Sequence, residues 1–333
     1  LALVAVLWYA VMHTEVGQDA AFARLAKLAM KSGDTPSADA LEVFVCGSSS
    51  PLPDINRAQA CIAIVTPENF FIVDAGAGSA VNVLAANLPL ARLQGLLLTH
   101  FHSDHIASIY DMNLNSWVQG RPKQLAVYGP NGVETVVAGI NEAYALDRSY
   151  RVKHHGAALL PPELGLLAPI EVTAGDVLQM GSLKITVFAT DHSPVSPSVG
   201  YRFDYKGRSV VVTGDTIITP AVAAAVQDLD VLVADAMSIP IVTAMESAAK
   251  EAGRDRVAKI LGDIQTYHAP VADVSALARK AGVRLTVLYH MVPPPRNALM
   301  ENIYEREAGH GVILSHDRMW IVLPANETGY TLR

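Results

Sequence analysis

Short apolar runs separated by turn residues recur along the chain from about residue 40 to its end. The segments LEVFVC (41–46), ACIAIV (60–65), FFIVDAG (70–76) and GLLLTH (95–100) have the length, β-branched content and flanking Gly, Pro or Asn that are typical of buried strands. Longer amphipathic stretches, such as SAVNVLAANLPLARL (79–93), lie between these runs and predict helices. This mixture of hairpins and strand–helix units predicts an α/β protein with helices on the outside of its sheets.

Polar residues fall at the ends of several predicted strands. Apolar runs finish in Thr-His at 99–100, Thr-Asp-His at 190–192, Thr-Gly-Asp at 213–215 and Tyr-His at 289–290. Functional groups of α/β proteins gather at strand ends and in the loops that follow them. We therefore expect these side chains to meet at one edge of the fold.

The first twelve residues, LALVAVLWYAVM, are apolar but fall short of the roughly 20 residues that span a bilayer. Our leading interpretation of residues 1–31 is a signal anchor or signal-peptide remnant, followed by a linker at 32–39 and one domain at 40–333. The alternative is an ordinary amphipathic helix packed on that domain. The leading interpretation predicts a periplasmic or inner-membrane-anchored protein, with the membrane as a partner of the N-terminal segment.

Composition narrows the range of partners. The chain has 25 Lys and Arg residues against 32 Asp and Glu residues, a net charge of -7, and shows no cluster of basic residues. Because tight binding of nucleic acid normally needs clustered positive charge, a nucleic-acid partner is disfavoured. Cys46 and Cys61 flank a turn-rich stretch and could meet across a hairpin. Since two cysteines do not make a disulfide scaffold, we favour the prediction that they are unpaired and buried, and the alternative is a pair across the hairpin.

The segment THFHSDHIAS (99–108) carries the candidate chemistry. Imidazole and carboxylate groups are ligands of zinc and similar metals, and residues two apart in an extended turn share a face. One ion can therefore be held by the first two histidines and a second by the pair that begins the next helix. Four ligand-type side chains within six positions predict metal binding: His100, His102, Asp104 and His105.

With this HxHxDH motif, the sequence resembles the metallo-β-lactamase superfamily from about residue 41 to its end. The resemblance implies a four-layer αββα sandwich with mixed sheets and helices outside. Asp74 is implied to orient a ligand histidine from outside the ligand set, and the alternative is that it stabilises its own turn. The implied ligands are His100, His102 and His192 for one metal, Asp104, His105 and His290 for the other, and Asp215 as a bridge between them.

A dinuclear centre of this kind has a defined chemistry. Two close cations repel each other, and a shared carboxylate offsets that repulsion. A water molecule that bridges them loses its proton near neutral pH, and the resulting hydroxide attacks an ester while the metals stabilise the developing charge. Zinc is the expected metal of the pair, and manganese and iron also suit His and Asp ligands.

Three further segments resemble the ribonuclease Z and arylsulfatase-like branch: GSSSPLPDINRA (47–58), DHSPVSPSVGYRF (191–203) and YHAPVADVSALARKAGVRLTVLYH (267–290). The last match implies that His268 contacts the scissile group or protonates the leaving group. Together with Asp104 of the HxHxDH motif, His268 is a candidate catalytic residue. Ala269 and Pro270 depart from the ribonuclease form, in which small hydroxyl residues follow this histidine. The alternative for His268 is a residue at a helix start with no catalytic task.

The stretch between His105 and His192 is longer than a minimal core needs. We predict that about 111–168 forms a capping insertion over the pocket, and the alternative is a solvated helix end and loop. The guanidinium of Arg151 could bind an anionic ester oxygen. The candidate substrate contacts are Trp117, Tyr150, Arg151, His154 and His155.

These observations favour a dinuclear hydrolase of small phosphate or sulfate esters, either a phosphodiesterase or an arylsulfatase-like enzyme. By resemblance, Asp215 counts against β-lactam hydrolysis, because authentic metallo-β-lactamases usually lack a bridging Asp. The acidic composition counts against transfer-RNA processing. Two alternatives stay open: hydrolysis of a lactone or β-lactam carbonyl, and a non-catalytic membrane-anchored metal-binding module. A homo-oligomer is also compatible with the sequence.

Overall fold

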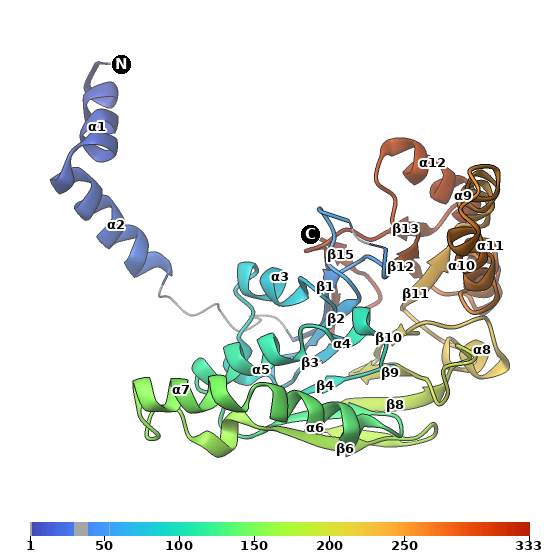
Figure 1. Ribbon diagram of the computed structural model, residues 1–333, viewed down its shortest axis with the longest axis horizontal. Helices are drawn as coiled ribbons and strands as arrows, with labels where there is room; N and C mark the ends of the chain where they lie inside the picture. The colour runs from blue at the N-terminus through green and yellow to red at the C-terminus, as the bar shows by residue number, and fades with distance from the viewer. Residues whose placement is uncertain (1, 30–38, 53) are drawn as a thin grey trace.

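Residues 2–29, 39–52 and 54–333 are described by the structure, a computed structural model of the chain (Figure 1). One sheet contains β1 (Ala40–Gly47), β2 (Cys61–Val65), β3 (Phe70–Val73), β4 (Gly95–Leu97), β5 (Leu125–Gly129), β6 (Leu167–Glu171), β14 (Trp320–Pro324) and β15 (Thr331–Leu332). The other contains β7 (Val177–Met180), β8 (Leu183–Ala189), β9 (Val199–Tyr205), β10 (Arg208–Val212), β11 (Val231–Met237), β12 (Leu285–Val292) and β13 (Val312–Leu314).

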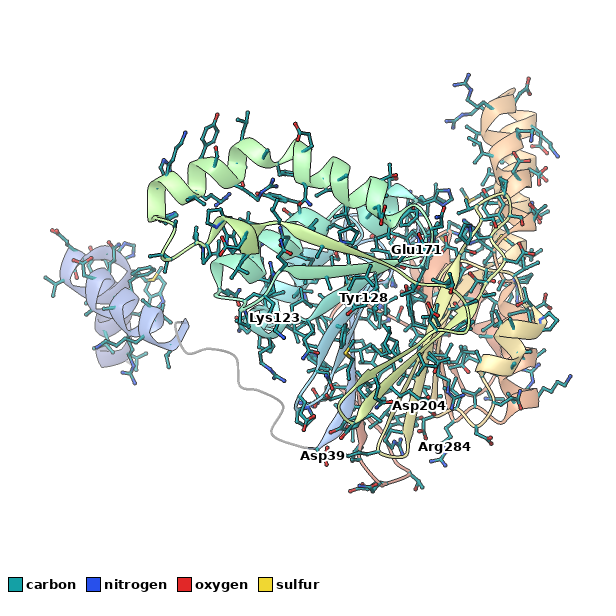
Figure 2. All side chains as sticks on the ribbon, turned by 90° about the horizontal axis from the view of Figure 1, so that it is seen from below. Asp39, Lys123, Tyr128, Glu171, Asp204 and Arg284 are labelled. Atoms are coloured by element: carbon teal, nitrogen blue, oxygen red, sulfur yellow. A yellow bond between two sulfur atoms is a disulfide. The ribbon has the colours of Figure 1, made fainter. Side chains whose placement is uncertain are left out.

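The two sheets are mixed and pack face to face. Their strand orders are β15-β14-β1-β2-β3-β4-β5-β6 and β13-β12-β11-β10-β9-β8-β7. Figure 2 shows the molecule from below, where Tyr128 on β5 marks the first sheet and Asp204 on β9 marks the second. A single apolar cluster takes side chains from both sheets, so the main core lies between them.

Most central strands are buried on both faces, which explains why they appear in the sequence as continuous apolar runs. Side chains alternate across a strand, so Ile62 and Ile64 of β2 enter the core between the sheets. Cys61, Ala63 and Val65 of the same strand enter a second apolar cluster beneath the outer helices.

Helices cover the outer face of each sheet. Side chains of α3, α5 and α6 pack on the first sheet, and those of α8, α11 and α12 pack on the second. The predicted four-layer αββα sandwich is therefore confirmed. The helices of this domain are α3 (Ser79–Ala85), α4 (Ser103–Ile106), α5 (Ile109–Val118), α6 (Val133–Ala143), α7 (Ala145–His155), α8 (Pro220–Ala225), α9 (Ile239–Glu251), α10 (Asp255–Asp263), α11 (Val271–Ala281) and α12 (Ala298–Ala308), with 3-10 turns η1 (Leu90–Arg92), η2 (Pro162–Gly165) and η3 (Ile264–Thr266).

The range predicted as a capping insertion, about 111–168, largely belongs to the sandwich itself. Within it, β5 pairs in parallel with β4 and β6, and α6 packs Val133 and Val137 into the outer apolar cluster. In contrast, α7 has no buried residue. The prediction of a separate cap is wrong for most of this range, because periodicity alone does not tell a helix that covers a sheet from one that covers a pocket.

Cys46 and Cys61 form a disulfide between β1 and β2, with their Cα atoms 5.0 Å apart. The prediction that these cysteines are unpaired is therefore wrong. The pairing of β1 with β2 shifts register between Val45 and Gly47, and both cysteines enter the same outer apolar cluster. Ahead of that shift Val45 lies opposite Ile62, a register that brings Cys46 beside Cys61, and alternation alone does not reveal which register two strands adopt.

The N-terminal residues form two helices, α1 (Ala2–His13) and α2 (Glu15–Ala29), which Figure 1 shows apart from the sandwich. Large apolar side chains on both helices are exposed, among them Leu7, Trp8 and Phe22. A helix packed on the domain, which was our alternative interpretation, would bury such side chains. In the described part of the chain, no helix is both long enough and apolar enough to cross a bilayer. Most of the predicted linker at 32–39 lies outside the described residues.

Candidate metal centre

The side chains expected at strand ends meet at one edge of the sandwich. His100 follows β4, His192 follows β8 and Asp215 follows β10. His290 lies near the end of β12 with a φ of 43°, a conformation that non-glycine residues rarely adopt. The structure brings together all seven side chains that the resemblance implies as ligands, although they come from four separate parts of the chain.

One part of the centre, which we call the histidine half, consists of His100, His102 and His192. The Nδ1 atom of His102 lies 3.0 Å from Nε2 of His100 and 3.3 Å from Nε2 of His192. Oδ2 of Asp215 lies 3.9 Å from Nε2 of His100 and 3.8 Å from Nε2 of His192. His102 is exposed whereas the other two histidines are buried, so the centre meets solvent beside His102.

The other part, which we call the carboxylate half, consists of Asp104, His105 and His290, all of them buried. Oδ2 of Asp104 lies 3.4 Å from Nε2 of His105 and 3.0 Å from Nε2 of His290. Asp215 reaches this half as well, with Oδ2 3.4 Å from Nε2 of His105 and Oδ1 3.3 Å from Nδ1 of His290. The carboxylate of Asp215 therefore contacts both halves, which is the geometry that a bridging ligand needs.

Asp74 holds the turn that carries the first ligands. Its carboxylate accepts hydrogen bonds from the N–H and the hydroxyl of Thr99, both 2.9 Å long, and lies 2.8 Å from Nδ1 of His105. With Nδ1 engaged, Nε2 of His105 faces the centre. Gly76 is needed nearby, because a Cβ at that position would lie 2.2 Å from the backbone oxygen of Asp104. These contacts are the ones that an orienting role for Asp74 requires.

Asp235 is a site residue that sequence reasoning missed. It lies on β11 and is buried, with Oδ2 2.9 Å from Nδ1 of His268 and Oδ1 3.3 Å from Nδ1 of His290. It links the candidate proton donor to the carboxylate half. The available signal was one Asp inside the apolar run VLVADAM, since a carboxylate is rarely buried without a specific partner.

Electrostatics differ between the two halves. Burial would raise the pKa of Asp104, but the neighbouring imidazoles of His105 and His290 outweigh it and hold the pKa well below its usual range. Burial would lower the pKa of His290, but Asp215 and Asp104 raise it to about 10. In the histidine half, burial and the neighbouring His105 instead hold the pKa of His100 well below its ordinary value. Negative charge is therefore concentrated in the carboxylate half.

The residues of the centre fit a pair of divalent cations. Two of their buried atoms, Nε2 of His105 and Oδ1 of Asp215, have no hydrogen-bond partner, and such atoms are costly unless something binds them. Imidazole nitrogens and carboxylate oxygens are the donors that zinc, manganese and iron accept. Among the described residues there are three sets of possible ligand residues, and within each set the ligand atoms lie within 4.8 Å of one another. All three sets are made of residues of this centre and the adjoining His268 and Asp235.

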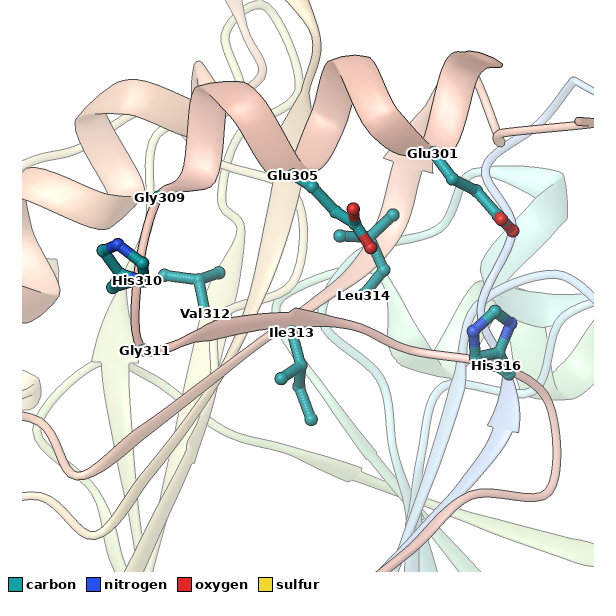
Figure 3. A pocket seen from close by; sticks show the side chains of 9 residues that line it. All are labelled: Glu301, Glu305, Gly309, His310, Gly311, Val312, Ile313, Leu314 and His316. Atoms are coloured by element: carbon teal, nitrogen blue, oxygen red, sulfur yellow. The ribbon is translucent and has the colours of Figure 1, made fainter. Parts of the chain in front are cut away.

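A different hollow lies between α12 and β13, lined by Glu301, Glu305, His310 and His316 among others (Figure 3). Although these four side chains are also possible ligands, they form none of the close sets found in the described part of the chain. Figure 3 shows them spread along the hollow, so a cation there would lack a preformed shell of donors.

The predicted substrate contacts are not gathered at the centre. Trp117 is only 2% exposed, packs near Gly165 and donates its indole N–H to the carbonyl of Pro161, so its prediction as a substrate contact is wrong. The other four lie on α7: Tyr150, Arg151, His154 and His155. Nε of Arg151 contacts the carboxylate of Asp147 at 2.7 Å. The described contacts join none of these four to the metal centre, and their role in substrate binding stays a prediction.

Comparisons with known proteins identify the family. The model of the beta-lactamase superfamily domain matches residues 69–291. A ribonuclease Z of Mycobacterium bovis is 36% identical over 259 residues, which cover 76% of this chain and 86% of the relative. The metallo-β-lactamase fold protein YhfI of Bacillus subtilis has 18% identity and a TM-score of 0.63 over 85% of this chain and all of that chain. The short form of human tRNase Z has 16% identity and a TM-score of 0.59 over 85% of this chain and 99% of that chain.

The chain belongs to the metallo-β-lactamase superfamily of hydrolases. Within that superfamily it belongs to the ribonuclease Z branch, as three segments of the sequence predicted. Membership implies divalent metal ions, typically zinc, and supports hydrolysis of phosphoesters. The names of the relatives do not support our expectation that nucleic acid is an unlikely partner.

Proposed function

We propose that this protein is a metal-dependent hydrolase of small phosphodiesters. The observation that carries the proposal is the pair of ligand sets that share the carboxylate of Asp215. When bound, two divalent cations would supply Lewis acidity and a nucleophilic water at neutral pH. The histidine half would hold one cation and the carboxylate half would hold the other, with zinc as the expected metal.

The side chains around the cations would do the remaining work. Asp235 engages Nδ1 of His268 and leaves Nε2 of that ring to give a proton to the leaving oxygen. Asp104 would act as an ionised ligand rather than as a proton acceptor, because its neighbours hold its pKa low. Asp74 would keep the ring of His105 aimed at the centre.

Substrate size separates two candidate functions. The net charge of -7 and the lack of a basic cluster in the sequence favour a small ester, because RNA binding relies on neutralised phosphates. The relatives named ribonuclease Z favour RNA as the second candidate. Both substrates contain the same phosphodiester bond, so the proposed chemistry serves either one. The hypotheses that sulfate esters, lactones or β-lactams are substrates are supported by sequence resemblance alone, and these compounds serve as comparison substrates.

A substrate panel tests the proposal. The zinc-loaded full chain is assayed with bis(p-nitrophenyl) phosphate, p-nitrophenyl sulfate, a lactone, a β-lactam and a precursor transfer RNA. We expect the diester to be hydrolysed with the highest kcat/KM, and His102→Ala to remove that activity. A higher kcat/KM for the precursor RNA would make RNA the substrate. No turnover of any substrate by protein that holds two zinc ions would overturn the proposal and favour a non-catalytic metal-binding module.

We also propose that the chain works outside the cytoplasm. The Cys46–Cys61 disulfide supports this location, because such bonds persist mainly in oxidising compartments. The exposed apolar side chains of α1, including Leu7, Trp8 and Met12, support contact with a lipid surface. Acid quenching of cells, alkylation and mass spectrometry would report the state of the two cysteines. Alkylation of both residues in the native host would contradict the proposal.

A further inference from the structure

A chain of aromatic rings lines one side of the metal centre and ends in Tyr267. The ring centroids of His102 and His192 lie 5.2 Å apart, and those of His192 and Tyr267 lie 5.0 Å apart at an interplanar angle of 90°. The ring of Tyr267 is also 5.0 Å from that of His268. His102 and His192 are implied ligands and His268 is the candidate proton donor. Tyr267 is neither, so its aromatic side chain has no role in the chemistry proposed above.

The position of Tyr267 is fixed from both sides. Its carbonyl oxygen lies 3.0 Å from Nδ1 of His192, so the main chain is tied to the histidine half. The next residue, His268, is held by Asp235 at 2.9 Å. Tyr267 itself is half-buried, whereas His192 and His268 are 1% and 4% exposed. The phenol ring therefore stands at the rim, between the buried histidines and solvent.

The position of the proton donor determines which part of a substrate meets this ring. If His268 protonates the leaving oxygen, as the proposed function has it, that oxygen lies within hydrogen-bond reach of the imidazole. The group attached to the oxygen then extends toward the rim, where the neighbouring ring is that of Tyr267. An aromatic leaving group can stack on it, and aromatic pairs contribute stabilisation beyond the area that they bury.

We infer that Tyr267 determines specificity for aryl phosphodiesters by stacking on the aromatic leaving group. This inference rests on the proposed function. In the reaction, a bond forms between phosphorus and the oxygen of water, and the bond between phosphorus and the aryl oxygen breaks with its electron pair on that oxygen. His268 gives the aryl oxygen a proton, and the proton released from water restores His268. The product phenol leaves neutral past Tyr267.

The test compares two methyl phosphodiesters, one with a phenyl and one with a fluoroalkyl leaving group of matched acidity. Wild type, Tyr267→Leu and Tyr267→Phe are assayed as zinc-loaded full chains. The matched Tyr-to-Leu control is Tyr330→Leu, at an exposed residue next to β15, the edge strand of the first sheet. We expect Tyr267→Leu to lower the phenyl-to-fluoroalkyl ratio of kcat/KM by about 3- to 10-fold. The ratio should stay unchanged in Tyr267→Phe and Tyr330→Leu, because the first keeps the ring and the second leaves the site intact.

A binding measurement keeps this inference separate from the proposed function. Calorimetry of phenylphosphonate against methylphosphonate should show the same loss of aryl preference in Tyr267→Leu, whether or not the protein turns over either ester. If wild type hydrolyses neither ester but shows this aryl preference in binding, the proposed function fails while the stacking role stands. An unchanged ratio in Tyr267→Leu would overturn the inference alone. An equal loss on both esters with a lowered zinc content would also overturn it, because Tyr267 would then only pack His192.

Discussion

The histidine half and the carboxylate half share Asp215 but differ in burial, charge and backbone. His102 is exposed in the first, whereas Asp104, His105 and His290 are buried in the second. Burial and nearby histidines lower the pKa of His100, whereas buried carboxylates raise the pKa of His290 to about 10. His290 also has a positive φ, which non-glycine residues adopt only where the surrounding structure holds them there.

This difference suggests a division of labour between two sites that share one ligand. The histidine half offers nitrogen donors that are already neutral at pH 7 and has a route to solvent. The carboxylate half is buried and charged, and Asp74 and Asp235 orient its histidines from outside. We expect the first half to exchange metal and receive substrate, and the second to need its surrounding carboxylates to bind metal at all. Four experiments test this comparison.

The largest effect should come from the shared ligand. Asp215→Ala removes a carboxylate that contacts both halves, so we expect zinc content to fall in both and kcat/KM for the diester to fall on the order of 10⁴-fold. Metal analysis and steady-state kinetics measure the two effects. Asp204→Ala, on β9 and paired with Lys184, is the matched control and should keep both metals. Retention of two zinc ions by Asp215→Ala would show that the halves do not share a bridge.

The next effect concerns proton donation beside the carboxylate half. His268→Ala should lower kcat by about 10²- to 10⁴-fold for esters with poor leaving groups and much less for p-nitrophenyl esters, because only a basic leaving oxygen needs the proton. Zinc content should not change. Asp235→Asn weakens the hold on both His268 and His290, so it should give a smaller loss of kcat with the same dependence on the leaving group, together with a lower zinc affinity of the carboxylate half. A loss that is equal for all leaving groups would show that His268 serves structure rather than proton transfer.

The site residues that the sequence predicted and those that it did not differ in how the fold places them. His100, His192, Asp215 and His290 follow or end apolar strands, and strand ends converge in this class of fold, so spacing and resemblance were sufficient. Asp235 lies inside a strand, where an apolar run conceals it, and Tyr267 gains its position only because η3 and α11 bring it beside His192. These two depend on tertiary packing rather than on a local pattern.

The errors have equally specific causes. Trp117 was expected at the pocket because it lies in the stretch predicted as a cap, yet it packs near Gly165 within the sandwich. The disulfide depends on the register of β1 against β2, in which Val45 lies opposite Ile62 and Cys46 comes beside Cys61, and the alternation of apolar residues does not encode that register. The α/β class with helices outside the sheets, in contrast, follows from the order of strands and helices in the sequence, and the four-layer sandwich follows from the family resemblance.

Metal affinity should depend on pH more strongly in the carboxylate half. In the metal-free protein the pKa of His290 lies at about 10, above its ordinary value of 6.5, so this ring holds a proton at pH 7 that metal must displace. Its zinc affinity should therefore rise about tenfold per pH unit for each proton displaced between pH 7 and 9. His100, whose pKa lies below its ordinary value, is already neutral there, and the histidine half should change little. Competition with a chelator across this range measures both sites, and parallel pH slopes would contradict the division.

The smallest effect should come from the residue that orients His105. Asp74→Asn keeps the hydrogen bond from the N–H of Thr99 but weakens the hold on Nδ1 of His105, so zinc affinity of the carboxylate half should fall about 10- to 100-fold. Thr99→Val removes a hydroxyl that donates to Asp74 and also lies 3.1 Å from Nδ1 of His100, so it should weaken both binding steps by a smaller factor. Calorimetric zinc titration resolves the two binding steps if their affinities differ as expected. Equal weakening of both steps in Asp74→Asn would mean that Asp74 supports the whole 99–105 turn, and that the two halves cannot be tuned apart by their supporting carboxylates.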